Sequence, residues 1–443
     1  MGEHRRWVIL CIGIAAQIAS VSALFGVPFV LPELRAAYGL TIAEAGTLAG
    51  LPSLGLLATL FGWGVVIDRY GERFTMAASL VLTALALLLL GVVDGPWGAG
   101  AVLTLVGAAG GPVNAASGRL VLAWFSARQR GLAMGIRQAA QPLGIGASAA
   151  LMPLVAEHWG FVAAMLLPAA LAVAMVPPVL LYAGAPDAEP RESGERREPG
   201  EPGPPGSQSR TPEPGPVSPS PEPGTAAGTP AGHADSVPRA PGAPGGARRG
   251  ASPYRHAAIW RVHGVSMLLG VPQFTVMTYA LVYLVSEHGW SAPTAGAVIA
   301  ATQVPGALSR LLLGLWSDRL GSRLRPVRTV ALVSGAALLG LTASSAVLPG
   351  AAVPLLLACL VLSMSHNGLT FTAVAETAGL AWAGRAMAAQ NSLQAVSTTA
   401  TPLLMGLVIT GLGLHTVFAV AAAFCAAAVL AVPRDRAAGP PPL

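Results

Sequence analysis

The sequence contains no lysine, so arginine supplies all 26 of its Lys and Arg residues. A formal charge of +6 and a pI near 9.8 would by themselves suggest a nucleic-acid-binding protein. The arginines, however, stand between apolar runs or in one mixed-charge segment, and they form no stripe with aromatic residues. The sequence therefore predicts no nucleic-acid partner.

Charged residues of either sign are scarce. They make up 10% of the chain, against the roughly 25% that is usual in soluble proteins, while hydrophobic residues make up 53% and the mean hydropathy is +0.62. Such a composition is typical of a protein that crosses a membrane many times. We expect a multi-pass protein of the plasma membrane, surrounded by membrane lipid.

The groups that covalent and catalytic chemistry requires are also rare. The three cysteines, Cys11, Cys359 and Cys425, all fall within apolar runs, so we expect no disulfide. The sequence has no His or Asp cluster with metal-ligand spacing and no intramembrane nucleophile with a neighbouring base. We therefore expect no metal, no cofactor and no enzymatic activity.

Twelve apolar runs are each near the ~20 residues that a bilayer core requires. The first run lacks a clear small-residue cleavage site, so we expect a span and not a cleavable signal. The first half has runs at about 7–31, 43–67, 74–94, 98–125, 131–156 and 160–183, and the second at about 257–286, 292–317, 326–346, 350–377, 385–411 and 413–432. The predicted fold class is an all-α membrane protein with twelve transmembrane helices.

The loops differ in their content of arginine. One side of the membrane receives Arg5, Arg6, Arg69, Arg73, Arg128, Arg130, Arg319, Arg323, Arg325, Arg328, Arg385, Arg434 and Arg436. The short loops of the other side contain only Arg35. Because basic residues are retained on the cytoplasmic side, we expect both termini to be cytoplasmic.

Residues 185–255 separate the two halves and have a different composition. They are rich in Pro, Gly, Ser and Glu with interspersed Arg, which predicts a disordered cytoplasmic linker. A simple tether is the favoured interpretation, and a binding segment for a proline-recognising partner is the alternative. The predicted domains are thus helical bundles at 1–184 and 256–432, this linker, and a cytoplasmic tail at 433–443.

A short charged hairpin joins the second and third runs of each half. Its residues Gly64, Asp68, Arg69, Gly71 and Arg73 recur 250 positions later as Gly314, Asp318, Arg319, Gly321 and Arg323. The pairs Asn114 and Asn367, and Gln141 and Gln394, correspond at an offset of 253. The chain is therefore two copies of one unit.

Each hairpin position has a physical reason. Gly64 and its counterpart are small enough to let neighbouring helices approach closely. Gly71 and its counterpart allow a turn with positive φ. Asp68 can accept hydrogen bonds from the N-terminus of a helix, and we expect that helix to lie in the other half, near Arg385.

These hairpins resemble the signature of the major facilitator superfamily of secondary transporters, Gly-x-x-x-Asp-Arg-x-Gly-x-Arg, which lies between the second and third helices of each half. The resemblance covers nearly all of the chain except the linker and the tail. It implies two pseudo-symmetric six-helix bundles around a central cavity that opens alternately to either side of the membrane. It also implies that the hairpin residues act in gating.

Polar side chains inside apolar spans are costly and usually face a cavity, so they are the candidate substrate-binding residues. These are Arg137, Arg119, Gln141, Gln394, Asn114, Asn367 and His366. No Asp or Glu lies near the centre of any span. A cavity for a cation would need a buried acid, whereas guanidinium groups suit carboxylate, sulfonate or phosphate. The sequence therefore predicts a small organic anion as substrate.

Several of these roles have an alternative. Arg119 and Arg137 each lie six residues from a span end and could extend to the interface. Arg310, eight residues before Asp318, could bind substrate or pair within the hairpin. His366 is either a proton-linked switch or a hydrogen-bonded packing residue.

The fifth run separates two branches of the superfamily. Drug exporters carry Gly-x-x-x-Gly-Pro-x-x-Gly-Gly there, whereas this chain, aligned on Pro142, keeps Gly146 but has Arg137, Gln141 and Ile145 at the other glycine positions. The segments 124–125 and 130–135 and a proline at 153 resemble the monocarboxylate and organic-anion branches.

We therefore expect a secondary active transporter for an organic anion. A multidrug or metabolite exporter is the alternative, and a non-transporting receptor or scaffold is the alternative of another class. The coupling ion is a proton or another ion, and both uptake and export are compatible with the sequence.

Overall fold

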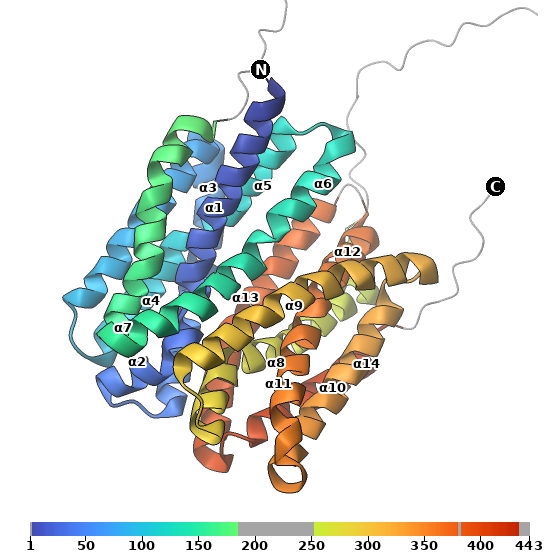
Figure 1. The fold of residues 1–443 in the computed structure, drawn as a ribbon. Helices are drawn as coiled ribbons and strands as arrows, with labels where there is room; N and C mark the ends of the chain where they lie inside the picture. Colours follow the sequence, from blue (N-terminus) through green and yellow to red (C-terminus); the bar gives the residue numbers. More distant parts are fainter. Residues whose placement is uncertain (1, 185–251, 380–381, 434–443) are drawn as a thin grey trace, which may run out of the picture. The chain divides into compact units, whose positions relative to one another are not determined.

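A computed structural model describes residues 2–184, 252–379 and 382–433 (Figure 1). Within these ranges all regular structure is helical, as predicted, and no strand is present. Nearly all of the predicted linker, residues 185–251, and of the predicted tail, residues 434–443, lies outside the described residues. The proposed domain boundaries therefore stay predictions.

In the part of the chain that the structure describes, the first half contains seven α-helices and the second half contains seven. Those of the first half are α1 (Gly2–Phe25), α2 (Leu31–Tyr38), α3 (Ile42–Leu88), α4 (Gly95–Gly110), α5 (Pro112–Trp124), α6 (Ala127–Gln138) and α7 (Ala140–Tyr182). Those of the second are α8 (Ala257–His288), α9 (Ala292–Leu320), α10 (Leu324–Val347), α11 (Ala352–Ser365), α12 (Asn367–Ala378), α13 (Ala383–Leu412) and α14 (Thr416–Ala431). Short 3-10 turns cover Val27–Val30, Leu89–Gly91, Pro253–Arg255 and Pro349–Ala351.

Nine helical stretches in the described ranges are long and apolar enough to cross a membrane. Two of them, Ile42–Gly91 and Ile136–Tyr182, have 50 and 47 residues. At 1.5 Å per residue each is about 70 Å long, more than twice a ~30 Å bilayer core. Each also contains a glycine with positive φ, Gly71 or Gly160, where the backbone departs from helical geometry. Each stretch is therefore long enough for two crossings, and the total of twelve stays a prediction.

The backbone repeats between the halves as the sequence does. Glycines with positive φ recur at matching places, with φ 63° at Gly39 and 67° at Gly289, 77° at Gly71 and 60° at Gly321, and 79° at Gly160 and 89° at Gly413. Such angles are accessible to glycine because it has no Cβ. The helix starts repeat too, because the side chains of Thr41 and Ser291 cap the N-termini of α3 and α9.

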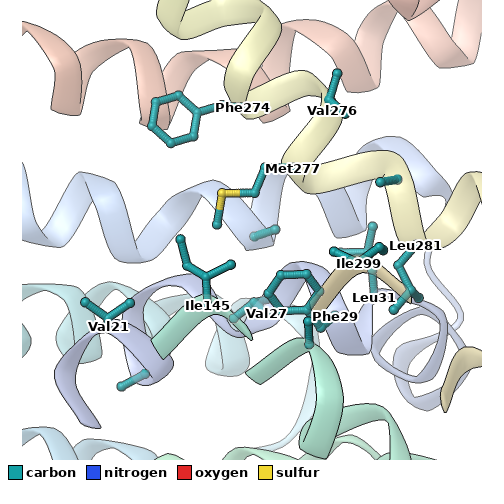
Figure 2. Packing of buried hydrophobic residues seen from close by; sticks show 14 of the residues in the cluster. Val21, Val27, Phe29, Leu31, Ile145, Phe274, Val276, Met277, Leu281 and Ile299 are labelled. Atoms are coloured by element: carbon teal, nitrogen blue, oxygen red, sulfur yellow. The ribbon is translucent and has the colours of Figure 1, made fainter. Parts of the chain in front are cut away.

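Residues of both halves belong to one buried hydrophobic cluster. Figure 2 shows Val27, Phe29 and Leu31 of the first half beside Leu281 of α8 and Ile299 of α9. All five side chains are 0–1% exposed. The chain just after α1 therefore packs against the second half.

Glycines make close contacts between the halves. A side chain at Gly296 of α9 would collide with the carbonyl oxygen of Ala149 on α7, and one at Gly406 of α13 would collide with the backbone of Ala43 on α3. These contacts lie at the ends of the helices remote from the two hairpins. Small residues permit such close packing of helices. The two halves are therefore closed against each other at that end.

Adding one methyl group at this contact tests the arrangement. We expect Gly296→Ala to open the contact, because overpacking against a backbone oxygen costs about 1–3 kcal/mol and shifts the equilibrium about fivefold or more. The reporter is Ala43→Cys in a cysteine-free background, and the measurement is its rate of labelling by a maleimide. Gly306→Ala on the same helix is the control, because a Cβ there meets no atom within 4 Å. Equal labelling of both variants would contradict the contact.

Candidate functional site

Arg137, in the last turn of α6, is the centre of a buried polar cluster. Its Nη1 donates to Asn114 Oδ1 at 2.7 Å, to Gln17 Oε1 at 3.1 Å and to Ser117 Oγ at 3.3 Å. Its Nη2 donates to Gln138 Oε1 at 2.9 Å, while Gln17 Nε2 donates to Asn114 Oδ1 at 3.1 Å. The helices α1, α5 and α6 thus bring their polar residues to one guanidinium.

The partners of Arg137 are all neutral. Its side chain is 8% exposed, and within the described part of the chain no carboxylate pairs with it. Amide oxygens satisfy its hydrogen bonds but leave its charge without a counter-charge, which is costly in a low-dielectric interior. Its Nε is buried with no hydrogen-bond partner. Among the described residues, the cluster therefore leaves one N–H group and the charge of Arg137 without compensation.

A small pocket adjoins Arg137. Its volume is about 10 Å³, room for roughly one water molecule, and apart from Arg137 and Ser117 it is lined by residues of α1 and by apolar residues of α5 and the position that follows it. Asn114 and Gln138, which bond to the guanidinium, are exposed.

Arg119, which was also a candidate substrate-binding residue, pairs with the first hairpin. Its Nη1 pairs with Asp68 Oδ1 at 2.5 Å and its Nε pairs with Glu72 Oε1 at 2.8 Å, so it links α5 to the first hairpin. The Arg119 and Asp68 side chains are 47% and 74% exposed, which limits the stabilisation by such a pair to about 1 kcal/mol. Among the described residues, the partner found for Asp68 is therefore Arg119 of its own half, and not the expected helix N-terminus near Arg385 in the other half.

The second hairpin is joined to its own half in a related way. Arg323 pairs with Asp318 and, at 3.0 Å, with Glu376 Oε1 of α12. A crevice of about 390 Å³ lies between this hairpin and α12. In the first half the arginine is on α5 and the acids are in the hairpin, whereas in the second half the arginine is in the hairpin and one acid is on α12. The two halves thus form the same link with different residues.

The remaining hairpin residues have separate environments. Gly71 and Gly321 adopt the expected positive φ. A Cβ at Gly64 or Gly314 would meet no atom within 4 Å, so the expected close helix contact at these glycines is not present. The side chains of Arg69, Arg73 and Arg319 are exposed, as are those of Asp68 and Asp318.

The other candidate residues form a second cluster. Gln394 Nε2 donates to Asn367 Oδ1 at 3.2 Å, within the second half. The neighbouring His366 is 1% exposed, and its Nε2 is buried without a hydrogen-bond partner. Gln141 is partly buried on α7. The structure therefore brings Asn114 together with Arg137, and Asn367 together with Gln394.

Three members of the Arg137 cluster are absent from the predicted site, namely Gln17, Ser117 and Gln138. Ser117 lies three residues after Asn114, and Gln138 follows Arg137 directly, so helical spacing could have indicated both. Gln17 lies 120 positions before Arg137, so its contact is visible only in the folded chain.

The counterpart of Arg137 in the second half is neutral. At the offset of 253 it is Gln390, whose Oε1 lies 2.5 Å from Nδ1 of His263. The duplicated positions therefore differ in charge, and the first half carries the guanidinium.

A carboxylate substitution tests whether the Arg137 charge lacks compensation. Gln17→Glu should keep or raise the melting temperature, because it places a counter-charge about 3 Å from Nη1. Gln273→Glu, at a buried glutamine whose Oε1 has no partner, is the matched variant and should lower the melting temperature by several degrees. An equal loss in both variants would show that Arg137 is already compensated.

Comparison with known proteins gives a consistent result. The family model described as Major Facilitator Superfamily matches residues 10–401. The chain is 37% identical over 434 residues to an uncharacterized MFS-type transporter of Mycobacterium tuberculosis, which covers 98% of this chain and 86% of that protein.

Shorter stretches match two other proteins. One is 28% identical over 165 residues to "Probable anion transporter 3, chloroplastic" of Oryza sativa subsp. japonica, covering 36% of this chain and 31% of that protein. Another is 31% identical over 147 residues to the membrane sensor protein UhpC of Escherichia coli, covering 32% and 33%.

A solved structure shares the fold. A bacterial homologue of the human lysosomal transporter Spinster, in an inward-facing and occupied conformation, superposes with a TM-score of 0.72 at 11% identity, covering 97% of this chain and 96% of that one. The predicted all-α transporter fold is thus confirmed, and the family shows a transporter and not an enzyme. The chain belongs to the Major Facilitator Superfamily of membrane transporters.

Proposed function

We propose that the protein is a secondary active transporter that moves a small organic anion across the plasma membrane by alternating access. The observation that carries this proposal is the guanidinium of Arg137, which is 8% exposed and bound only by neutral groups among the described residues. An anionic group would supply the missing counter-charge through charge-assisted hydrogen bonds. A cationic substrate would be repelled by the same guanidinium.

The distribution of acids supports an anionic substrate. Among the described residues, the acids are Glu3, Glu33, Glu44, Asp68, Glu72, Asp94, Glu157, Glu287, Asp318 and Glu376, and they lie in the hairpins or near the ends of spans. None of them pairs with Arg137. The interior of the helices thus has an excess of positive charge, which favours binding of a carboxylate, sulfonate or phosphate.

The closed end supports alternating access. The contacts of Gly296 and Gly406 join the halves remote from the hairpins, while the ion pairs that Arg119 and Arg323 form with the hairpin acids stay within each half. With the hairpins and both termini on the cytoplasmic side, this arrangement corresponds to a state that opens toward the cytoplasm. Transport then requires the glycine contacts to separate and the hairpin ends to approach each other.

Two of the relatives support the proposed substrate class and the receptor alternative, respectively. The Oryza sativa relative is named as a probable anion transporter, and its match covers 36% of this chain. The match to a membrane sensor keeps a receptor as the alternative of another class. A multidrug or metabolite exporter is the remaining alternative, and the coupling ion is a proton or another ion.

Replacement of Arg137 tests the substrate class. The parent should bind organic anions in preference to drug-like cations in a thermal-shift screen. Arg137→Ala should lower the affinity for the best anion about tenfold to a hundredfold, because a charged hydrogen bond in a buried site contributes ~1.5–3 kcal/mol. Arg137→Lys should recover only part of this, because an ammonium lacks the bidentate fork.

Arg119→Ala is the matched control, since Arg119 pairs with the first hairpin. It should leave the binding affinity unchanged. Melting temperatures measured on the same samples separate a binding role of Arg137 from a packing role, which would lower stability and not affinity. A parent that prefers cations would overturn the anion assignment in favour of the exporter.

The first hairpin provides a test of gating. Asp68→Asn should impair transport in vesicles while expression stays nearly normal, because asparagine keeps the shape but loses the charge that pairs with Arg119. Asp94→Asn is the control, because Asp94 precedes α4 without a side-chain capping bond. Unchanged turnover in Asp68→Asn would remove the hairpin from the mechanism.

A further inference from the structure

The end of α8 remote from the hairpins is bound to the turn between α13 and α14. In that turn, Nε2 of His415 lies 3.1 Å from Oε2 of Glu287, which belongs to the last turn of α8. The other ring nitrogen of His415, Nδ1, is buried with no hydrogen-bond partner. Among the described residues, Glu287 is therefore the one hydrogen-bond partner of this imidazole. We call the contact of Glu287 with His415 the clasp.

Tyr283 holds the clasp in place by packing. Its side chain is 1% exposed, and its ring makes edge-to-face contacts with His415 at 5.6 Å, with His288 at 5.2 Å and with Phe418 at 5.2 Å between centroids. Edge-to-face pairs of this kind are favourable beyond the area that they bury. The imidazole of His415 is thus fixed beside Glu287 by ring packing as well as by the hydrogen bond.

The strength of the clasp depends on pH. Histidine gains its positive charge as the pH falls through the neutral range. The clasp is a hydrogen bond to a neutral ring when His415 is uncharged, and it is an ion pair when His415 is protonated, which is the stronger of the two. The clasp therefore tightens in acid and weakens as the pH rises.

The expected gain on protonation is modest. The side chains of His415 and Glu287 are 36% and 37% exposed, and such a pair is partly screened by solvent. A proton on Nδ1 also has no acceptor there. We therefore expect the ratio of clasped to unclasped protein to change about fivefold at most.

Few other titratable groups face the clasp. Besides Glu287, the titratable side chains of α8, α10, α13 and α14 are Arg261, His263, Tyr279, Tyr283, His288, Arg325, Arg328, Arg385 and Cys425. The arginines and His263 are at the hairpin end of their helices, and Cys425 is midway along α14. From the first half, α2 packs against α8 and carries Glu33, Arg35 and Tyr38. In the described ranges, His288 is thus the other imidazole at this end of α8.

The clasp joins two helices that both contact α3 of the first half. The hydroxyl of Tyr279 on α8 donates to the carbonyl oxygen of Pro402 on α13 at 2.7 Å, and a Cβ at Gly46 of α3 would collide with the same hydroxyl. Gly406 of α13 lies against Ala43 of α3. The closed end therefore requires α8 and α13 to keep a fixed position relative to each other.

One side of α8 carries both contacts. Tyr279, Tyr283 and Glu287 follow at intervals of four residues, so they lie along the same side of the helix. This side meets α13 at Tyr279 and the turn after α13 at Glu287, about 12 Å further along. Loosening of the clasp frees the end of α8 from α13 and so weakens the contact of Tyr279 with α3.

The sequence repeat does not account for the clasp. The counterpart of Glu287 in the first half, at the offset of 250, is Ala37, and the counterpart of His415, at the offset of 253, is Val162. Neither side chain carries a charge or a hydrogen-bonding group. The clasp is therefore an addition to one half and not a requirement of the shared fold.

We propose that the clasp is a pH-sensitive device, which holds the end remote from the hairpins closed in acid and favours its opening as the pH rises through the neutral range. In the proposed orientation this end faces the outside of the cell, so opening to the outside responds to external pH. The inference goes beyond the proposed function, since it does not depend on the charge of the substrate.

Distances across the closed end test the proposal. Nitroxide labels at Trp97→Cys in the first half and Leu348→Cys in the second, which are 91% and 62% exposed, are introduced into the full chain in a cysteine-free background. Double electron–electron resonance in nanodiscs then gives the ratio of closed to open protein. Between about pH 5.5 and about pH 8.5 this ratio should fall about twofold to fivefold. Glu287→Gln should remove the response by lowering the closed fraction in acid.

Two substitutions of His415 separate the clasp from a folding defect. His415→Arg keeps a permanent positive charge beside Glu287, so the closed fraction should stay high at both pH values. His415→Gln keeps a hydrogen bond without charge, so the closed fraction should stay low at both. Opposite shifts with an equal loss of pH response do not arise from a common loss of stability.

Two further histidines serve as controls. His158 is exposed at the same end of the first half, where Nδ1 lies 3.1 Å from the carbonyl oxygen of Leu154, and His158→Gln should leave the pH response unchanged. His288→Gln should also retain it. If His288→Gln removes the response and His415→Gln does not, another imidazole titrates and the proposal is overturned.

Melting temperatures on the same samples give the remaining outcomes. If pH changes the melting temperature of the parent through His415 but leaves the ratio of closed to open protein constant, the clasp stabilises the fold without controlling opening, and the proposal is wrong. The same pH response in the parent and in His415→Gln would also overturn it. A parent that binds cations would overturn the proposed substrate class and leave this inference standing.

Discussion

The buried guanidinium of Arg137, which has no counter-charge among the described residues, is the physical constraint that the proposed site depends on. In the interior of the helices the cost of an ion is set by its partners, and Arg137 has only amide and hydroxyl partners among the described residues. The acids that could neutralise it lie in the hairpins or near the ends of spans, where Asp68 and Glu72 pair with Arg119 instead. The proposed affinity for an anion rests on this separation of charges along the molecule.

The repeat could be predicted from sequence because its strongest markers depend on backbone geometry alone. Gly71 and Gly321 occupy positive φ whatever packs around them, so the 250-residue offset is visible without a structure. The helix boundaries were less predictable. The chain at Gly71 departs from helical geometry at a single residue inside α3, and sequence spacing does not distinguish such a break from a loop.

The candidate site was predictable only in part. Arg137 stands out because an arginine in an apolar run has few structural reasons to be there. Arg119 stands out equally, yet it faces the hairpin, and helical spacing alone does not show which neighbour a side chain of α5 meets. The contact of Gln17 with Arg137, across 120 positions, depends on the packing of α1 against α5 and α6.

The glycine contacts at the closed end have a consequence for rate. Gly296 and Gly406 meet backbone atoms of the opposite half, so no interlocked side chain has to change rotamer at these points when the halves part. The carbonyl groups there lie within helices, where intrahelical bonding already satisfies them. Separation of these helices therefore meets little activation barrier of its own. Opening at this end also requires Phe29, which is 1% exposed, to leave its apolar surroundings.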